Sequence, residues 1–191
     1  MEATQDLLWE QGYSATSPKD IMRRSGAGQG SMYHHFTNKQ ELAVVALECS
    51  AQSMRHDAEK LLATDGSAYE IATAYLRRQR DVLKGCRMGR MTFDADVLNT
   101  PELIEPVKRT FVWLLEALTA LFERGRDQGE FAADIDARNL ASLVVATVQG
   151  GYVLARATRD TDAFDAAVEG AAALLHKATV PLTTEVSDHS E

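Results

Sequence analysis

The sequence has little of several residue types, and each shortage excludes a class of protein. Its 191 residues include only two cysteines, four prolines and twelve glycines. Cys49 and Cys86 have no CxxC spacing and no histidines clustered beside them, which suggests neither a disulfide framework nor a zinc site. We interpret both as small apolar residues, the alternative being a redox role. No metal and no cofactor is therefore expected.

Long apolar runs are also missing. No stretch approaches the roughly 20 uninterrupted apolar residues that a membrane span requires. Met1 is followed by Glu2 rather than by a basic and then apolar signal segment. With 45% hydrophobic and 25% charged residues, the composition is typical of a soluble globular protein. The sequence therefore predicts a cytoplasmic protein with no membrane partner.

Positive charge is scarce overall but concentrated in one place. The net charge of −8 argues against a nucleic-acid partner. Residues 17–39, however, contain four cations and one anion, a net +3, which leaves −11 for the rest of the chain. We interpret this short segment as electrostatically unlike everything around it and as a candidate contact with DNA.

The sparse glycine and proline leave long intervals whose apolar residues recur at helical spacing, which predicts an all-α protein. One helix should end near 11, and others should span 18–25, 29–36, 39–63, 68–83, 91–98, 101–128, 137–158 and 161–177. On the 39–63 helix the apolar positions are Leu42, Val45, Ala46, Cys49 and Leu61. The polar run from 181 is expected to be a frayed tail.

Two short helices joined by a tight glycine turn are typical of a helix-turn-helix, which places its second helix in the major groove. Ser17, Pro18 and Asp20 occupy the N-cap, first and third positions of the helix they begin. Gly26 permits the left-handed conformation that the turn needs. A tight corner in any helical protein is the alternative interpretation of this segment.

The predicted second helix has two faces. Met32 and Phe36 are four residues apart and can pack together on Ile21 and Ala27. The opposite face then carries an amide, a hydroxyl and two rings, which are groups that read base edges or contact phosphates. Those residues are Gln29, Ser31, Tyr33 and His34. Lys39 heads the following helix, where backbone N–H groups and the helix dipole already attract a phosphate.

The stretch from 12 to 42 resembles the DNA-binding signature of the TetR family of transcriptional regulators. The matching residues are Gly12-Tyr13, Ala15-Thr16, Ile21, Ser25-Gly26-Ala27, Gly30-Ser31-Met32-Tyr33-His34-His35-Phe36 and Asn38-Lys39-Gln40-Glu41-Leu42. The resemblance implies a helix-turn-helix DNA-binding domain over 1–46, a helical ligand-binding and dimerisation domain over 47–180, and a flexible tail over 181–191. It also implies a repressor rather than an enzyme.

Roles of single residues follow from the same resemblance. It implies that Ser17 and Lys19 touch the DNA backbone or a base and that Lys39 grips a phosphate of the operator. The residues implied to face the groove are Gln29, Gly30, Ser31, Tyr33 and His34. A separate physical argument also favours a homodimer. One short recognition helix reads few base pairs, and a two-fold dimer doubles the number that is read on a palindrome.

The larger domain is expected to hold a small-molecule effector. Large apolar and amphipathic side chains with a few polar atoms suit an apolar or aromatic ligand. The candidate lining residues are Tyr75, Met88, Met91, Phe93, Trp113, Phe122, Gln149 and Tyr152, although each alone can equally be plain core. Residues 84–89 are similar to a glycine-cysteine element of a TetR subgroup that responds to aromatic compounds. The last two helices carry apolar stripes, and in the family such helices form the homodimer interface; closing the monomer core is the alternative.

An enzyme and a helical scaffold are the two alternatives to a regulator. An enzyme would need a nucleophile with a positioned base, paired carboxylates in a cleft or a metal cluster, and the sequence displays none of these. A helical scaffold without DNA binding requires the helical corner to be accidental. The favoured hypothesis is a ligand-controlled regulator. Ligand binding moves the long helix that begins at Lys39, which changes the distance between the two recognition helices of the dimer so that they no longer match successive major grooves.

Overall fold

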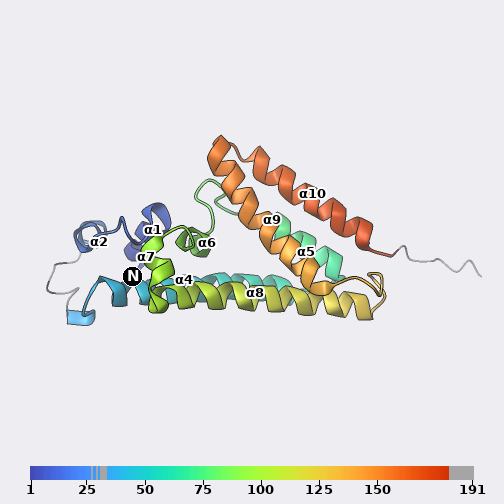
Figure 1. The fold of residues 1–191 in the computed structure, drawn as a ribbon, viewed down its shortest axis with the longest axis horizontal. Coiled ribbons are helices and arrows are strands. Elements are labelled where there is room, and N and C mark those ends of the chain that lie inside the picture. The colour runs from blue at the N-terminus through green and yellow to red at the C-terminus, as the bar shows by residue number, and fades with distance from the viewer. Residues whose placement is uncertain (27, 29, 31–33, 181–191) are drawn as a thin grey trace, which may run out of the picture.

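The computed structural model describes residues 1–26, 28, 30 and 34–180, and these residues form an all-helical fold (Figure 1). An isolated antiparallel bridge joins Phe131 to Thr179. The helices are α1 (Glu2–Gln11), α2 (Pro18–Ser25), α4 (Lys39–Leu62), α5 (Ala68–Arg77), α6 (Arg87–Met91), α7 (Ala95–Asn99), α8 (Pro101–Asp127), α9 (Ala137–Thr158) and α10 (Asp162–Ala178). The prediction of an all-α protein is confirmed.

The N-terminal end of the molecule has a small core of its own. Leu7 of α1, Ile21 of α2 and Leu42 of α4 are buried together, and Phe36 packs against them. The predicted packing of Phe36 beside Ile21 is therefore confirmed. Met32 and Ala27, the other members of the predicted cluster, lie outside the described residues, as does half of the helix predicted over 29–36.

The long helices α4 and α8 run side by side along the molecule, and α5, α9 and α10 lie over one part of their length (Figure 1). The main core fills the space between them, with Leu76, Leu103, Leu118 and Phe122 at 1% exposure or less. The predicted apolar face of α4 is wrong at two positions, because Val45 is 37% exposed and Cys49 is also exposed. The buried face of α4 is formed instead by residues that include Ala43, Ala46 and Leu47.

The predicted helix starts are confirmed where a side-chain cap marks them. Ser67 forms a capping box with Glu70 at the start of α5, and Asn38 accepts a hydrogen bond from the Glu41 backbone N–H at the start of α4. Asp136 caps α9 by accepting hydrogen bonds from two backbone N–H groups. These caps satisfy N–H groups that have no partner inside the helix.

The predictions between 78 and 99 need correction. The helix expected over 68–83 ends at Arg77, because Arg78 turns to extended backbone with ψ 145°. Arg80 then folds back and its guanidinium donates to the carbonyls of Tyr75, Leu76 and Arg78, which would otherwise lack partners at the helix end. The helix expected over 91–98 is in fact two, α6 and α7, separated by a turn that Asp94 caps.

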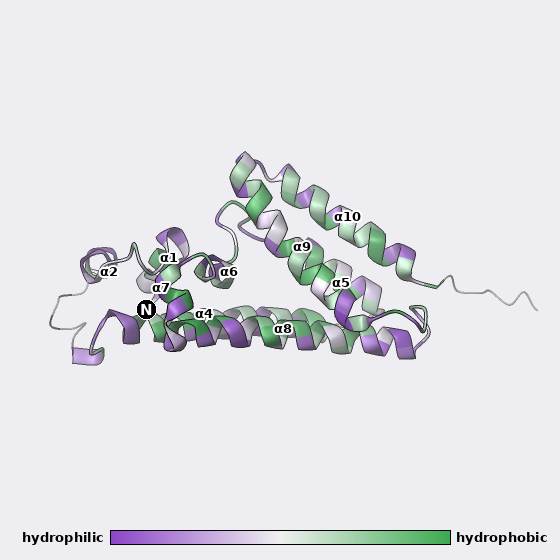
Figure 2. Ribbon diagram, in the orientation of Figure 1, coloured by the Kyte–Doolittle hydropathy of each residue, from purple (hydrophilic) through white to green (hydrophobic). Residues whose placement is uncertain are grey.

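Helix α9 is long and apolar enough to cross a membrane by length and composition alone, although 33% of its most apolar window is buried within the protein. It packs against α8 and α10, its two principal neighbours. In Figure 2, many residues along the ribbons of α9 and α10 are coloured as hydrophobic. One helix of this kind is weak evidence for a membrane span, since core helices of soluble proteins have the same composition.

Candidate nucleic-acid interface and ligand cavities

Helix α2 begins and ends as the sequence predicts. The Ser17 hydroxyl accepts a hydrogen bond from the Asp20 backbone N–H at 3.1 Å, and the Asp20 carboxylate accepts one from the Ser17 backbone N–H at 3.1 Å. The Ser17 hydroxyl also donates to the Asp20 carboxylate at 2.5 Å, and this bond, followed by the one from the Ser17 backbone N–H, lowers the pKa of Asp20 against the effect of burial. Gly26 closes the helix in the left-handed conformation, with φ 69°. The Ser17 side chain thus holds the helix start in addition to its predicted contact with DNA.

The cations of α2 are not equally free to meet a phosphate. Arg23 pairs with Asp20 at 2.8 Å, and Arg24 pairs with Glu10 of α1 at 2.9 Å. Lys19 is exposed and has no ion-pair partner within the described part of the chain. Of the two predicted contacts at the start of α2, Lys19 is therefore the one with an unengaged side chain.

Lys39 at the head of α4 reaches back to the turn before α2. Its Nζ donates to the Tyr13 carbonyl at 2.8 Å and lies 3.9 Å from the centre of the Tyr13 ring. Burial lowers the pKa of the Lys39 amine, and the nearby carboxylates Asp96 and Asp94 oppose that effect. An ammonium has three N–H donors, so the contact with Tyr13 leaves donors for a phosphate.

The predicted recognition residues are only partly described. Gly30 and His34 are exposed, as a groove-facing side requires, and the ring of His34 lies 4.9 Å from that of His35. Gln29, Ser31 and Tyr33 lie outside the described residues, so their predicted contacts remain predictions.

The predicted ligand-contacting residues fall into three places. Tyr75, Met88, Met91 and Phe122 are core side chains at 3% exposure or less. Trp113 lines a large groove between α4 and α8, whereas Phe93, Gln149 and Tyr152 line a smaller cavity between α6 and α9. Phe93 is 78% exposed at that cavity, because the turn between α6 and α7 carries it outward. The structure does not gather the predicted set into one pocket.

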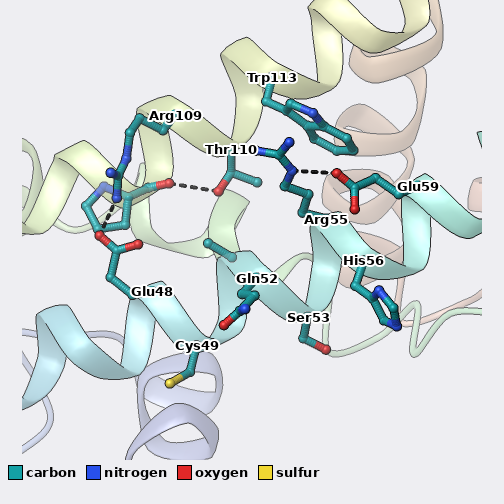
Figure 3. Close-up of a pocket in the computed structure, with 12 residues that line it drawn as sticks. Glu48, Cys49, Gln52, Ser53, Arg55, His56, Glu59, Arg109, Thr110 and Trp113 are labelled. Carbon is teal, nitrogen blue, oxygen red and sulfur yellow. Dashed lines mark hydrogen bonds and ion pairs between the residues drawn. The ribbon is translucent and has the colours of Figure 1, made fainter.

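The larger groove is polar, with a volume of about 1000 Å³. Ion pairs line it: Arg109 with Glu48, and Arg55 with Glu59 at 2.7 Å, the Arg55 guanidinium also lying 4.8 Å from the Trp113 ring centre (Figure 3). Every arginine that lines this groove is thus neutralised by a glutamate that also lines it. Cys49 lies at its wall, which corrects its interpretation as a buried apolar residue (Figure 3).

The smaller cavity has a volume of about 260 Å³ and different chemistry. Its lining residues are Gly85, Cys86, Gly89, Arg90, Phe93, Gln149, Tyr152, Val153 and Arg156. Cys86 is buried, and its sulfur accepts a hydrogen bond from the Gly89 backbone N–H at 3.2 Å, so it helps to begin α6. The cavity therefore joins the element predicted over 84–89 to the middle of α9.

Sequence reasoning missed the charge of the segment that forms this cavity. Residues 77–90 contain six cations and one anion, a net +5, which exceeds the +3 of residues 17–39. The interpretation of 17–39 as the one segment electrostatically unlike its surroundings is therefore wrong. A count of charged residues over 77–90 would have revealed this second basic segment.

Residues 84–94, which overlap this basic segment, contact α1 and the turn that follows it. Trp9 of α1 donates its indole N–H to the Gly85 carbonyl at 3.0 Å, and Arg87 pairs with Asp6 of α1 at 3.2 Å. The Arg87 guanidinium also lies 4.2 Å from the Trp9 ring centre. Farther along, the Asp94 carboxylate accepts hydrogen bonds from the Ser14 backbone N–H at 2.8 Å and from its hydroxyl. Residues 84–94 thus touch the cavity on one side and α1 on the other.

A short capped helix that ends in a left-handed glycine and packs on α1 and on the head of a long helix is typical of a helix-turn-helix DNA-binding regulator. The comparisons with known families agree. Residues 1–46 match the family model "Bacterial regulatory proteins, tetR family", and residues 66–171 match "Tetracyclin repressor-like, C-terminal domain". The chain belongs to the TetR family of transcriptional regulators and is not an enzyme.

Relatives and solved structures place it in the same group. The uncharacterized HTH-type transcriptional regulator YxaF of Bacillus subtilis is 25% identical over 161 residues, 81% of each chain. The HTH-type transcriptional repressor ComR of Escherichia coli is 26% identical over 171 residues, 82% of this chain and 77% of that protein. The crystal structure of a TetR transcriptional regulator from Chloroflexus aurantiacus superposes with a TM-score of 0.83 at 27% identity, covering 93% of each chain.

Proposed function

We propose that the protein is a homodimeric repressor that binds a palindromic operator and releases it when a small apolar or aromatic molecule binds the domain over 47–180. One observation carries this proposal: residues within 84–94 line the cavity beside α9 and also contact α1, where Gly85 accepts from Trp9 and Arg87 pairs with Asp6. Asp94 of the same segment holds Ser14, which follows α1. A ligand that shifts this segment would move α1. Because α1 packs on both α2 and α4, the helix-turn-helix would move with it.

The outward faces of α9 and α10 support the dimer. Each helix buries one apolar face in the core and carries a second stripe of small and apolar residues on the opposite side. On α9 this stripe is Leu143, Ala146, Thr147, Gly150, Leu154 and Ala157; on α10 it is Ala163, Ala166, Ala167, Gly170, Ala173 and Leu174. A helix that is apolar on both sides needs a second partner, and small residues let helices approach closely. A second copy of α9 and α10 meets that need.

Linkage between ligand and operator tests the proposal. The operator is first selected from random duplex DNA with the full-length protein, and a thermal-shift screen of aromatic and lipophilic compounds supplies the ligand, because selective binding raises apparent stability. Fluorescence anisotropy then measures DNA affinity with and without ligand, and calorimetry measures ligand affinity with and without DNA. Each should weaken the other by the same factor, about 5- to 150-fold for typical coupling. Simultaneous binding without interference would refute ligand-driven release.

A further inference from the structure

The two cavities differ in how their charges are balanced. Arginines and glutamates alternate in the groove between α4 and α8 and pair with each other (Figure 3). The cavity between α6 and α9 is lined by two arginines, Arg90 and Arg156, and by no carboxylate among the described residues. Its wall therefore carries a net positive charge with no counter-charge from the described protein.

Neither arginine is engaged elsewhere in the described chain. Their neighbours Arg77 and Arg87 pair with Glu169 and Asp6, whereas Arg90 and Arg156 have neither an ion pair nor a side-chain hydrogen bond to any described residue. The Arg156 side chain lies along Gly85, whose backbone has φ 82°. The Nη1 atom of Arg156 is 3.7 Å from the position that a Cβ on residue 85 would occupy. Gly85 thus leaves room for this guanidinium beside the cavity.

A third cation lies behind the cavity wall. Arg80 is mostly enclosed, its guanidinium is bonded only to backbone carbonyls, and its Nε has no hydrogen-bond partner among the described groups. It packs against the Phe164 ring at 5.8 Å, and that ring in turn lies 5.1 Å from the ring of Tyr152. Burying a guanidinium without a carboxylate partner is costly, and no ion pair within the described part of the chain balances the charge of Arg80.

The rest of the lining is apolar with a few hydrogen-bonding groups. Phe93 is 78% exposed and Val153 is 51% exposed, so both offer unoccupied apolar surface. Gln149 contributes an amide. Burial raises the pKa of Tyr152 to about 12, so its phenol stays neutral and does not compete with an anion for the arginines. The volume of about 260 Å³ is slightly below the roughly 300 Å³ at which drug-sized pockets begin.

We propose that this cavity binds a small aromatic carboxylate, with the carboxylate held by Arg90 and Arg156 and the ring lying against Phe93 and Val153. Guanidinium groups bind carboxylates through paired, charge-assisted hydrogen bonds, which are the strongest kind available to a small ligand. The proposal rests on the proposed function in that it names the chemical class of the effector. It narrows that class from any apolar or aromatic molecule to an anionic one.

Three probes of one shape test the charge preference. Calorimetry with the full-length protein at neutral pH compares 2-naphthoate, the neutral 2-naphthamide and the cationic 2-naphthylmethylamine. The naphthoate should bind at least about tenfold more tightly than the amide, because hydrogen bonds to a charged group are stronger than those to a neutral one. The amine should bind most weakly. Equal affinities, tighter binding of the amide, or no naphthoate binding up to about 1 mM would overturn the proposal.

Matched variants locate the site. In the double variant Arg90→Gln, Arg156→Gln, naphthoate affinity should fall to that of the amide while amide affinity stays unchanged. Arg138→Gln is the control, because Arg138 is an exposed arginine on the same helix as Arg156 and lies outside the cavity. It should leave all three affinities as in the wild type. Loss of amide binding together with naphthoate binding, or an altered oligomeric state of the double variant, would overturn the proposal in favour of a packing role.

Operator binding separates this inference from the proposed function. If naphthoate binds through the two arginines but operator affinity is unchanged, the anion site stands and release by that anion fails. If another compound releases the operator equally well from the wild type and the double variant, ligand-driven release stands and the anion site is overturned as the effector site.

Discussion

Lys39 holds the turn before α2 as well as heading α4. Its amine contacts the carbonyl and ring of Tyr13, which fixes the start of α4 against the segment that leads into Ser17. The next residue, Ser14, is held by Asp94 from the larger domain. Single side chains thus set the orientation of the helix-turn-helix, and substitutions at these positions are expected to change stability and DNA binding together.

Lys39→Ala should weaken operator binding and lower stability. Loss of one phosphate contact per subunit should reduce the slope of log affinity against log salt by about one per subunit. Loss of the Tyr13 contact should also lower the melting temperature. Lys60→Ala is the control, since Lys60 is exposed in the last turn of α4. An unchanged salt slope, measured by fluorescence anisotropy, would remove Lys39 from the DNA contacts.

Asp94→Asn should destabilise the protein in a pH-dependent way. Burial alone would raise the pKa of Asp94, but hydrogen bonds from Ser14, Val97 and Asp96 outweigh it and hold the pKa below its ordinary value of 3.8. A lowered pKa in the folded state means that the ionised carboxylate stabilises the fold above about pH 4 and that this contribution disappears as the pH falls further.

Urea unfolding should therefore show Asp94→Asn to be less stable than the wild type by about 1–3 kcal/mol at pH 7. The difference should shrink as the pH falls below 3.8, the ordinary pKa of the side chain. Asp65→Asn, in the exposed turn before α5, should behave like the wild type. A difference that stays constant with pH would show that the carboxylate charge is not what stabilises this contact.

At the scale of helices, α9 and α10 are apolar on two sides, and only one side is covered within the chain. Gly150 and Gly170 lie near the middle of the uncovered stripes, and a Cβ at either position would meet no described atom within 4 Å. These glycines have no structural requirement inside one subunit. Close approach of a second subunit supplies a reason for them.

Gly150→Leu should disrupt the dimer without unfolding the subunit. Leucine is a better helix former than glycine by up to about 1 kcal/mol, and a Cβ at this position meets no described atom of the subunit within 4 Å. A leucine in a closely packed helix interface would separate the two copies. Sedimentation velocity should show a shift towards monomer, together with weaker operator binding. Glu123→Leu on the exposed surface of α8 should remain dimeric. A fully dimeric Gly150→Leu protein would place the interface elsewhere.

At the scale of the whole molecule, two basic segments stand out in a chain with a net charge of −8. One forms the turn region around α2, and the other runs from the end of α5 through α6. The second segment contacts α1 through two interactions, the hydrogen bond from Trp9 to Gly85 and the ion pair of Arg87 with Asp6. The DNA-binding elements and the cavity wall are therefore joined by direct contacts. Displacing one part is therefore expected to disturb the other.

Much of this arrangement could be predicted from the sequence where local chemistry determines it. The start of α2, its end at Gly26 and the start of α9 follow from caps and glycine. The end of α5 could not be predicted, because it depends on Arg80 folding back onto carbonyls rather than on a glycine or proline. The cavity beside α9 was only partly predicted, because its walls are 60 or so positions apart in sequence. The contacts predicted for Gln29, Ser31 and Tyr33 remain predictions.

The salt dependence of operator binding tests the central claim most directly. Full-length protein and its selected palindromic duplex are titrated by fluorescence anisotropy from about 50 mM to about 200 mM salt. Phosphate contacts made by two subunits predict that log affinity falls linearly with log salt, at a slope of about −0.9 for each phosphate neutralised. Binding that does not change with salt, or no binding even at the lowest salt, would contradict a helix-turn-helix regulator that grips its operator through Lys19 and Lys39.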